Sequence, residues 1–152
     1  MYGYEIFHTS IMEKLIQSVR SNTFSHAYIF SGEKGIGKLN AARLFANALV
    51  CTGSSAPCGE CGSCSTAKAL TNPDIIYIDT GDKKSIGVET IRDINNDVFV
   101  KPFSSKAKVY IIKDGSLMTE AAQNALLKTL EEPPMYAVFI ILCNDISAML
   151  QT

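Results

Sequence analysis

Short apolar runs alternate with longer amphipathic segments along this chain. The apolar runs have the length of buried strands and cover residues 26–32, 74–79, 108–112 and 136–143. The amphipathic or Ala- and Leu-rich segments predict helices and cover residues 6–20, 38–51, 88–98 and 120–132. Strands that are apolar throughout and alternate with helices are typical of a parallel sheet with helices on both faces. The pattern therefore predicts an α/β fold.

Local signals place several element boundaries. Thr119 can cap the helix that follows it, and the pair Pro133-Pro134 ends that helix. Residues 52–65 are small, polar and rich in cysteine, so we expect a loop there. The sequence ends with "DISAMLQT", soon after the fourth predicted strand, and we expect a domain that continues beyond residue 152.

A glycine-rich stretch, "SGEKGIGKLN", joins the first predicted strand to the helix after it. It fits the phosphate-loop pattern G-x-x-x-x-G-K-[ST] at Gly32, Gly37 and Lys38, with Gly35 as a further glycine, up to the last position. Backbone N–H groups at a helix N-terminus can surround phosphate oxygens, and Lys38 would reach the outer phosphates. The alternative is a glycine-rich turn that contains a lysine without binding phosphate.

Two positions that hold Mg²⁺ in nucleotide hydrolases carry the wrong chemistry here. The hydroxyl that should follow Lys38 is replaced by Leu39. The third predicted strand should end in a metal-binding aspartate, but "KVYIIKDGS" places Lys113 there and Asp114 next to it. A lysine repels the cation, and adjacent strand residues point to opposite faces, so Asp114 is a poor replacement.

The sequence therefore predicts a degenerate ATPase site in a chain without enzymatic activity of its own. Neither ATP nor Mg²⁺ is an expected cofactor, although binding of a nucleotide or a phosphate without turnover stays open. Asn144 follows the fourth predicted strand. Two interpretations stand side by side: Asn144 occupies the place of a γ-phosphate sensor, or it is only a strand-end residue.

Four cysteines cluster in the predicted loop, namely Cys51, Cys58, Cys61 and Cys64. Four thiolates within one glycine-containing segment suit a tetrahedral structural zinc site, which is closed and implies no catalysis. A redox pair, unpaired thiols and an iron–sulfur cluster are the alternatives. The fifth cysteine, Cys143, ends an apolar strand and is expected to be an inert core residue.

Length and composition limit the class of protein. The 152 residues suit about one domain, and 47% hydrophobic residues allow a substantial core. A net charge of −1 argues against strong DNA binding by the chain alone, since nucleic-acid-binding domains are normally basic. The N-terminus lacks a secretory signal, and the longest apolar run, residues 137–143, is too short to cross a membrane. A cytoplasmic protein without membrane partners is predicted.

A phosphate loop followed, one helix later, by a four-cysteine segment resembles the bacterial clamp-loader subunits of the DNA polymerase III holoenzyme. The resemblance continues in "NPDIIYID", "VETIRDINNDV" and "KVYII", and is most specific in "MTEAAQNALLKTLEEPP" at residues 118–134. Within that family the tau/gamma motor subunits resemble intact ATPases. Leu39 and Lys113 instead resemble the degenerate positions of the delta-prime type of subunit.

The resemblance implies an AAA+ ATPase-like domain over residues 1–152, with strand order 5-1-4-3-2 and a zinc-binding insert at residues 51–64. It also implies a non-catalytic stator of a DNA-directed DNA polymerase holoenzyme, a nucleotidyltransferase. The stator would act with tau/gamma and delta subunits to load the sliding clamp onto primed DNA. A fifth strand, a lid, a Ser-Arg-Cys arginine finger and an oligomerisation domain would follow residue 152. The alternatives are an active motor subunit and a zinc-stabilised nucleotide-binding regulator.

Overall fold

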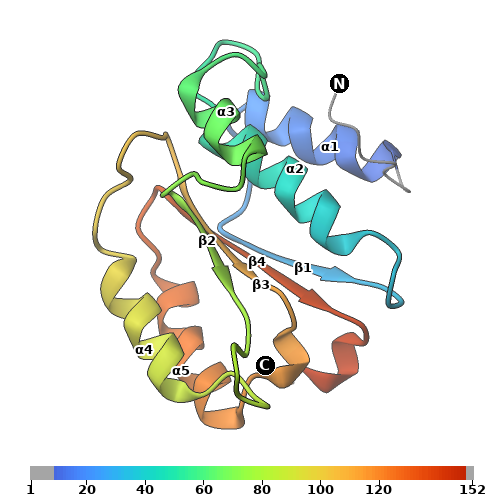
Figure 1. Ribbon diagram of the computed structural model, residues 1–152, viewed down its shortest axis with the longest axis vertical. Coiled ribbons are helices and arrows are strands. Elements are labelled where there is room, and N and C mark those ends of the chain that lie inside the picture. The colour runs from blue at the N-terminus through green and yellow to red at the C-terminus, as the bar shows by residue number, and fades with distance from the viewer. Residues whose placement is uncertain (1–8, 150–152) are drawn as a thin grey trace.

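Four parallel strands form one sheet with helices on both of its faces (Figure 1). The structure is a computed structural model and describes residues 9–149. The strands are β1 (Ala27–Ser31), β2 (Ile75–Ile78), β3 (Lys108–Ile112) and β4 (Ala137–Cys143). The helices are α1 (Thr9–Arg20), α2 (Lys38–Val50), α3 (Gly62–Lys68), α4 (Val88–Asp97) and α5 (Glu120–Glu131), with 3₁₀ turns η1 (Gly115–Leu117) and η2 (Ile146–Ala148). The predicted α/β fold with a parallel sheet is confirmed.

The strand order is β1-β4-β3-β2, and every neighbouring pair is parallel. This order agrees with the 1-4-3-2 part of the order that the resemblance implies. Every residue of β3 and β4 is buried, whereas β1 at the edge is partly exposed. Apart from Lys108 at the start of β3, the two central strands are apolar because helices cover both of their faces.

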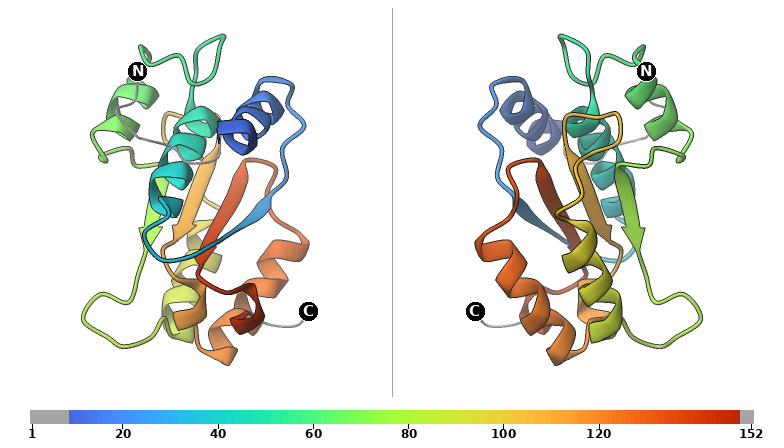
Figure 2. Two further views of the ribbon diagram at one scale, coloured as in Figure 1. Left: turned by 90° about the vertical axis from the view of Figure 1, so that its right-hand side faces the viewer. Right: turned by 90° about the vertical axis from the view of Figure 1, so that its left-hand side faces the viewer.

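The alternation of side chains along β3 separates two cores. Val109 and Ile111 face the core that α1 and α2 cover, whereas Tyr110 and Ile112 face the core that α4 and α5 cover. Figure 2 shows these two helical layers on opposite sides of the sheet. In the second core the ring of Tyr110 stacks on that of Phe139 with centroids 4.9 Å apart. The Tyr110 hydroxyl donates a hydrogen bond of 2.7 Å to Asp97 Oδ2.

Most predicted boundaries agree with the structure to within a residue or two, and one expected loop is partly wrong. Thr119 caps α5 as predicted, because its hydroxyl accepts a 3.1 Å hydrogen bond from the N–H of Ala122. Residues 6–8 of the first predicted helix lie outside the described residues. The expected loop at 52–65 is helical from Gly62 onward. The short helix α3 has no amphipathic pattern and is capped by the sulfur of Cys61, which is not a usual capping group.

Candidate metal centre and phosphate loop

Helix α2 separates the two candidate sites. Its N-terminus follows the glycine-rich loop, and its C-terminus leads directly into Cys51. The 13 residues of α2 span about 20 Å, since an α-helix rises 1.5 Å per residue. The sites therefore lie at opposite ends of α2 (Figure 1). The cysteine cluster takes no direct part in any chemistry at the glycine-rich loop.

The four predicted zinc ligands come together. The sulfur atoms of Cys51, Cys58, Cys61 and Cys64 all lie within 4.8 Å of one another, and those of Cys58 and Cys64 are 3.9 Å apart. Zinc–sulfur bonds of about 2.3 Å in a tetrahedron place the sulfurs about 3.8 Å apart. The donor set and its spacing therefore fit one tetrahedral metal ion.

Backbone N–H groups point at three of these sulfurs. Cys51 Sγ accepts from the N–H groups of Gly53 and Cys58 at 3.3 and 3.4 Å. Cys58 Sγ accepts from the N–H of Cys61, and Cys61 Sγ from that of Cys64, both at 3.3 Å. Such donors stabilise the thiolate, which is the form that binds a metal.

The thiol pKa values show at which cysteines the protein itself stabilises the thiolate and at which it does not. Backbone hydrogen bonds from Glu60 and Cys61 lower the pKa of Cys58. Burial opposes ionisation of Cys61, but hydrogen bonds from Thr52 and Cys64 outweigh it and lower its pKa to about 5. Burial raises the pKa of Cys64 to about 12. A bound divalent cation would favour the thiolate at all four positions together.

The four-cysteine insert (residues 51–64) is packed against the first helix. Arg20 Nε donates a 2.8 Å hydrogen bond to the carbonyl of Ala56. Ile16 and Val19 of α1 pack against the small core that contains Cys51 and Cys64. Sequence reasoning missed the contacts of Thr52 and Arg20, because a hydroxyl beside a cysteine and an arginine at a helix end are too common to indicate a site.

We expect the substitution Gly53→Ala to weaken metal binding by about tenfold or more, as other changes around metal ligands do. A Cβ atom at Gly53 would lie 2.7 Å from Cys58 Sγ and 2.9 Å from Cys58 Cβ, so the Cys58 ligand must move. Gly62→Ala is the matched control, because nothing lies within 4 Å of a Cβ placed there. Zinc competition against a chromogenic chelator measures both variants. Equal affinities for the two would contradict the geometry of the cluster.

The glycine-rich loop has the backbone that a phosphate loop needs. Gly35 and Gly37 have φ angles of +85° and +95°, in the left-handed region that favours glycine. Gly37 is the N-cap residue of α2 and provides no side-chain cap. The first turn of α2 therefore keeps N–H groups for an anion.

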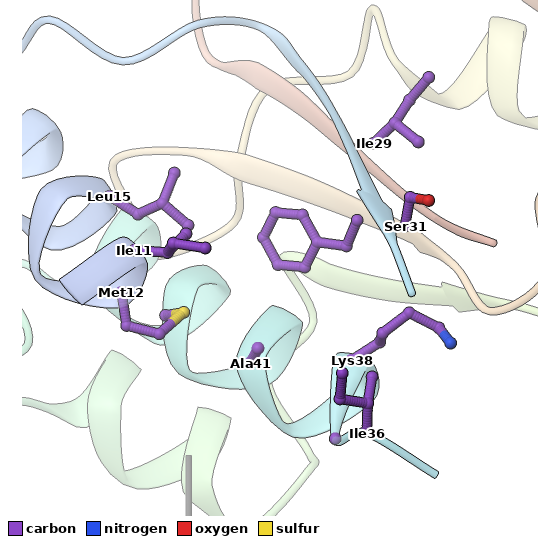
Figure 3. Close-up of a pocket in the computed structure, with 10 residues that line it drawn as sticks. Ile11, Met12, Leu15, Ile29, Ser31, Ile36, Lys38 and Ala41 are labelled. Carbon is purple, nitrogen blue, oxygen red and sulfur yellow. The ribbon is translucent and has the colours of Figure 1, made fainter. Parts of the chain in front are cut away.

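Lys38 connects the loop to the end of β4. Its Nζ donates to the carbonyl oxygens of Gly32 and Glu33 at 2.6 and 2.9 Å, and to Asn144 Oδ1 at 3.0 Å. The structure thus brings Lys38 and Asn144 together, although 106 residues separate them. Figure 3 shows the Lys38 side chain extending from the start of α2 toward the end of β1 that carries Ser31.

An apolar cavity adjoins Lys38. It has a volume of about 200 Å³, and Ile11 and Leu15 of α1, Ile29 of β1 and Ile36 of the loop are among its lining residues (Figure 3). Pockets that bind drug-sized ligands usually measure about 300–1,000 Å³. Among the described residues, this cavity is therefore smaller than a usual ligand pocket.

The three degenerate positions are engaged in structural contacts. Leu39 is half-buried and packs against the core under α2. Lys113 Nζ lies 3.3 Å from Asp79 Oδ2 and 5.7 Å from the centre of the Tyr77 ring. Hydrogen bonds from the Gly81 N–H and from Lys113 lower the pKa of Asp79. Nothing in the sequence indicated that Asp79 pairs with Lys113.

Asp114 caps the turn η1. Its Oδ1 accepts hydrogen bonds from the N–H and the hydroxyl of Ser116, at 3.0 and 2.5 Å. A capping carboxylate is already engaged with donors of its own turn. Packing, ion pairing and capping thus occupy Leu39, Lys113 and Asp114 respectively.

Within residues 9–149, no helix is both long enough and apolar enough to cross a membrane.

Several known proteins are similar to this chain. It is 43% identical over 140 residues to the tau subunit of DNA polymerase III from Bacillus subtilis. It is 39% identical over 137 residues to the tau/gamma subunit from Haemophilus influenzae, and 37% identical over 137 residues to the tau subunit from Escherichia coli. These alignments cover 89% of this chain but only 20% to 24% of the relatives, so the chain spans less than a quarter of their length.

A solved structure shares the fold. The gamma subunit-related protein from Thermotoga maritima matches with a TM-score of 0.69 over 91% of this chain and 41% of that protein, at 24% sequence identity. The family model described as "DNA polymerase III, delta subunit" matches residues 7–152, which is nearly the whole chain. The chain belongs to the DNA polymerase III delta subunit family.

Proposed function

We propose that this chain is the AAA+-like domain of a clamp-loader subunit that acts as a non-catalytic, delta-prime-like stator. It would help to load the sliding clamp onto primed DNA in the cytoplasm, together with tau/gamma and delta subunits of the same complex. The observation that carries the proposal is the state of the metal positions. Where a working ATPase has a hydroxyl and a carboxylate for Mg²⁺, this chain has a half-buried leucine packed against the core, Leu39, and an ion-paired lysine, Lys113.

The glycine-rich loop is, in this proposal, vestigial. Gly32, Gly35, Gly37 and Lys38 keep the backbone and the charge that hold a phosphate. Without Mg²⁺, Lys38 is left as the cation of the loop and the metal's share in stabilising the charge of phosphoryl transfer is lost, so the loop would hold an anion without hydrolysing it. Asn144 stays a candidate sensor because it contacts Lys38 directly.

The four-cysteine insert is proposed to hold one structural zinc ion through Cys51, Cys58, Cys61 and Cys64. The sulfur spacing and the N–H groups directed at three of the sulfurs support this assignment. Bound zinc would fix the insert on α1 and on the end of α2.

A second candidate function is that of an active motor subunit. The observation that favours it is the 37% to 43% identity to proteins named as tau or tau/gamma subunits. A motor needs a metal-bound nucleotide, so ATP turnover separates the two candidates.

We expect the complete subunit to hydrolyse ATP at background rate and to co-purify with the tau/gamma motor subunit. Turnover is measured with and without Mg²⁺, alongside Lys38→Ala as the control that removes the phosphate-contacting lysine. Turnover that depends on Mg²⁺ and is lost in Lys38→Ala would establish the motor and overturn the stator. Failure of the complete subunit to join the motor subunit would overturn the clamp-loader role.

A further inference from the structure

Buried polar side chains link the four-cysteine insert to a distant loop. Six polar or charged residues are buried within the described part of the chain: Asn47, Ser63, Asn72, Asp74, Lys108 and Thr129. Hydrogen bonds connect three of the six one after another, from Ser63 to Asn72 and from Asn72 to Asp74. Buried polar groups of this kind fix the backbone that satisfies them, because a lost partner costs the full desolvation penalty.

The connection begins at the cysteine cluster. Ser63 lies in the first turn of α3 between Cys61 and Cys64, and the sulfur of Cys61 caps that turn by accepting from the N–H of Cys64. The carbonyl oxygen of Ser63 accepts a 3.1 Å hydrogen bond from Asn72 Nδ2. The position of Ser63, and with it that of Asn72, therefore depends on how the two cysteines are held.

The connection continues from Asn72 into Asp74. Asn72 Oδ1 accepts a 2.8 Å hydrogen bond from the N–H of Asp74. The Asp74 carboxylate accepts three backbone N–H groups, from Phe103 at 2.5 Å, Ser104 at 3.0 Å and Ser105 at 2.9 Å. Burial alone would raise the pKa of Asp74, but these donors outweigh burial and lower it.

A second contact closes the connection. The hydroxyl groups of Ser63 and Ser105 lie 3.1 Å apart, so α3 touches the loop directly as well as through Asn72 and Asp74. The loop, residues 98–107, displays three large apolar side chains: Phe99, Val100 and Phe103 are 68%, 59% and 85% exposed. The side chains of Phe99, Val100 and Phe103 are thus exposed, whereas the backbone of residues 103–105 is held by the buried carboxylate of Asp74.

The first half of this loop is held differently. Lys108 Nζ donates to the carbonyl oxygens of Asp97 and Val100 at 2.8 and 3.1 Å. Tyr136 donates through its hydroxyl to the carbonyl of Val98 at 2.9 Å. These anchors come from β3 and from the segment before β4, and neither passes through the insert.

We propose that metal binding at the four cysteines controls the conformation of residues 103–105, through Ser63, Asn72 and the positioning residue Asp74. This inference rests on the proposed metal site. With the metal bound, α3 holds Ser63 in place and the carboxylate of Asp74 fixes the three N–H groups. Without the metal, the first turn of α3 loosens, and residues 103–105 lose their fixed position while residues 98–100 keep theirs.

Amide hydrogen exchange followed residue by residue by NMR tests this on the whole chain. We expect stripping of zinc to speed exchange at Phe103, Ser104 and Ser105 about tenfold or more, through local opening. The Val100 amide, which bonds to the carbonyl of Asp97 at 2.9 Å, serves as the internal control and should not change. Unchanged exchange at residues 103–105 in a protein shown to have lost its zinc would overturn the proposal.

Two variants test the aspartate itself. Asp74→Asn should speed exchange at the same three amides with zinc still bound. Asp79→Asn, the same substitution at the other end of β2, should leave them unchanged. Protection of the β3 and β4 amides reports whether each variant stays folded, and Ser63→Ala offers a milder change that removes only the hydroxyl contact to Ser105.

Zinc content is measured in every sample of this series. If the chain binds no zinc but Asp74→Asn still speeds amide exchange at residues 103–105, the metal site is overturned. The proposal that metal binding controls the conformation of these residues is then overturned as well. A zinc-bound chain in which Asp74→Asn leaves these amides unchanged would overturn the role of Asp74 and spare the metal site. Failure of this inference and failure of the proposed zinc site are thus distinguishable.

Discussion

Removing the metal from the four-cysteine insert should lower the thermal midpoint of the protein by ~8–16 °C. A ligand present at 1,000 times its Kd stabilises the folded state by about 4.1 kcal/mol. Each kcal/mol moves the midpoint of a domain of this size by roughly 2–4 °C. The insert packs on Ile16 and Val19 and accepts a hydrogen bond from Arg20, so its loosening also weakens α1. Thermal unfolding by calorimetry, with and without a strong chelator, measures the shift. Metal analysis of the same samples should give about one zinc per chain before chelation.

Two buried cysteines provide a matched pair for this experiment. Cys64 and Cys143 are each 1% exposed, but only Cys64 belongs to the cluster. Burial raises the pKa of the Cys143 thiol, which leaves it a neutral core group. Cys64→Ser should therefore reduce bound zinc below about half an ion per chain, whereas Cys143→Ala should keep it. Equal zinc content in the two variants, or no thermal shift on chelation, would rule out a structural zinc.

The elements buried in the sheet could be predicted closely from the sequence. The bounds of β3 agree with the prediction, and those of β4 differ from it by one residue, because a central parallel strand is apolar on both faces and stands out as a continuous run. The start of α5 was predictable because Thr119 caps it through a contact three residues away. The cysteine cluster was predictable for the same reason, since its four ligands lie within one short segment.

Contacts between distant segments could not be predicted in this way. Asp74 accepts from backbone N–H groups 29 to 31 residues later, and such donors exist at almost every position of a sequence. The pairing of Lys113 with Asp79 spans 34 residues and follows from the adjacency of β2 and β3. The sequence indicated that Lys113 is wrong for a metal, but only the fold shows what the lysine does instead.

Restoring the missing metal ligands should make nucleotide binding depend on Mg²⁺. We expect the double variant Leu39→Thr/Lys113→Asp to bind a fluorescent ATP analogue ~10-fold or more tightly with Mg²⁺ than with a chelator. The change from ammonium to carboxylate replaces repulsion of the divalent cation by attraction, which alters the product of the charges by four units. Each unit is worth about 1 kcal/mol at 4 Å in water before salt screening. In the unmodified protein the same ratio should be close to one. Titrations at fixed ionic strength give both values.

Lys113→Gln, combined with Leu39→Thr, separates the two effects of the lysine. It removes the repulsive charge and frees Asp79, but it supplies no carboxylate, so it should gain only a small part of the Mg²⁺ dependence. Adding Lys38→Ala to the restored protein should abolish the gain, because Lys38 is the cation of the loop itself. Leu39→Thr alone should cost stability without changing the ratio, since Leu39 packs against the core. If the unmodified chain already binds nucleotide tenfold more tightly with Mg²⁺, then Lys113 and Leu39 do not disable the site, and the stator proposal loses its basis.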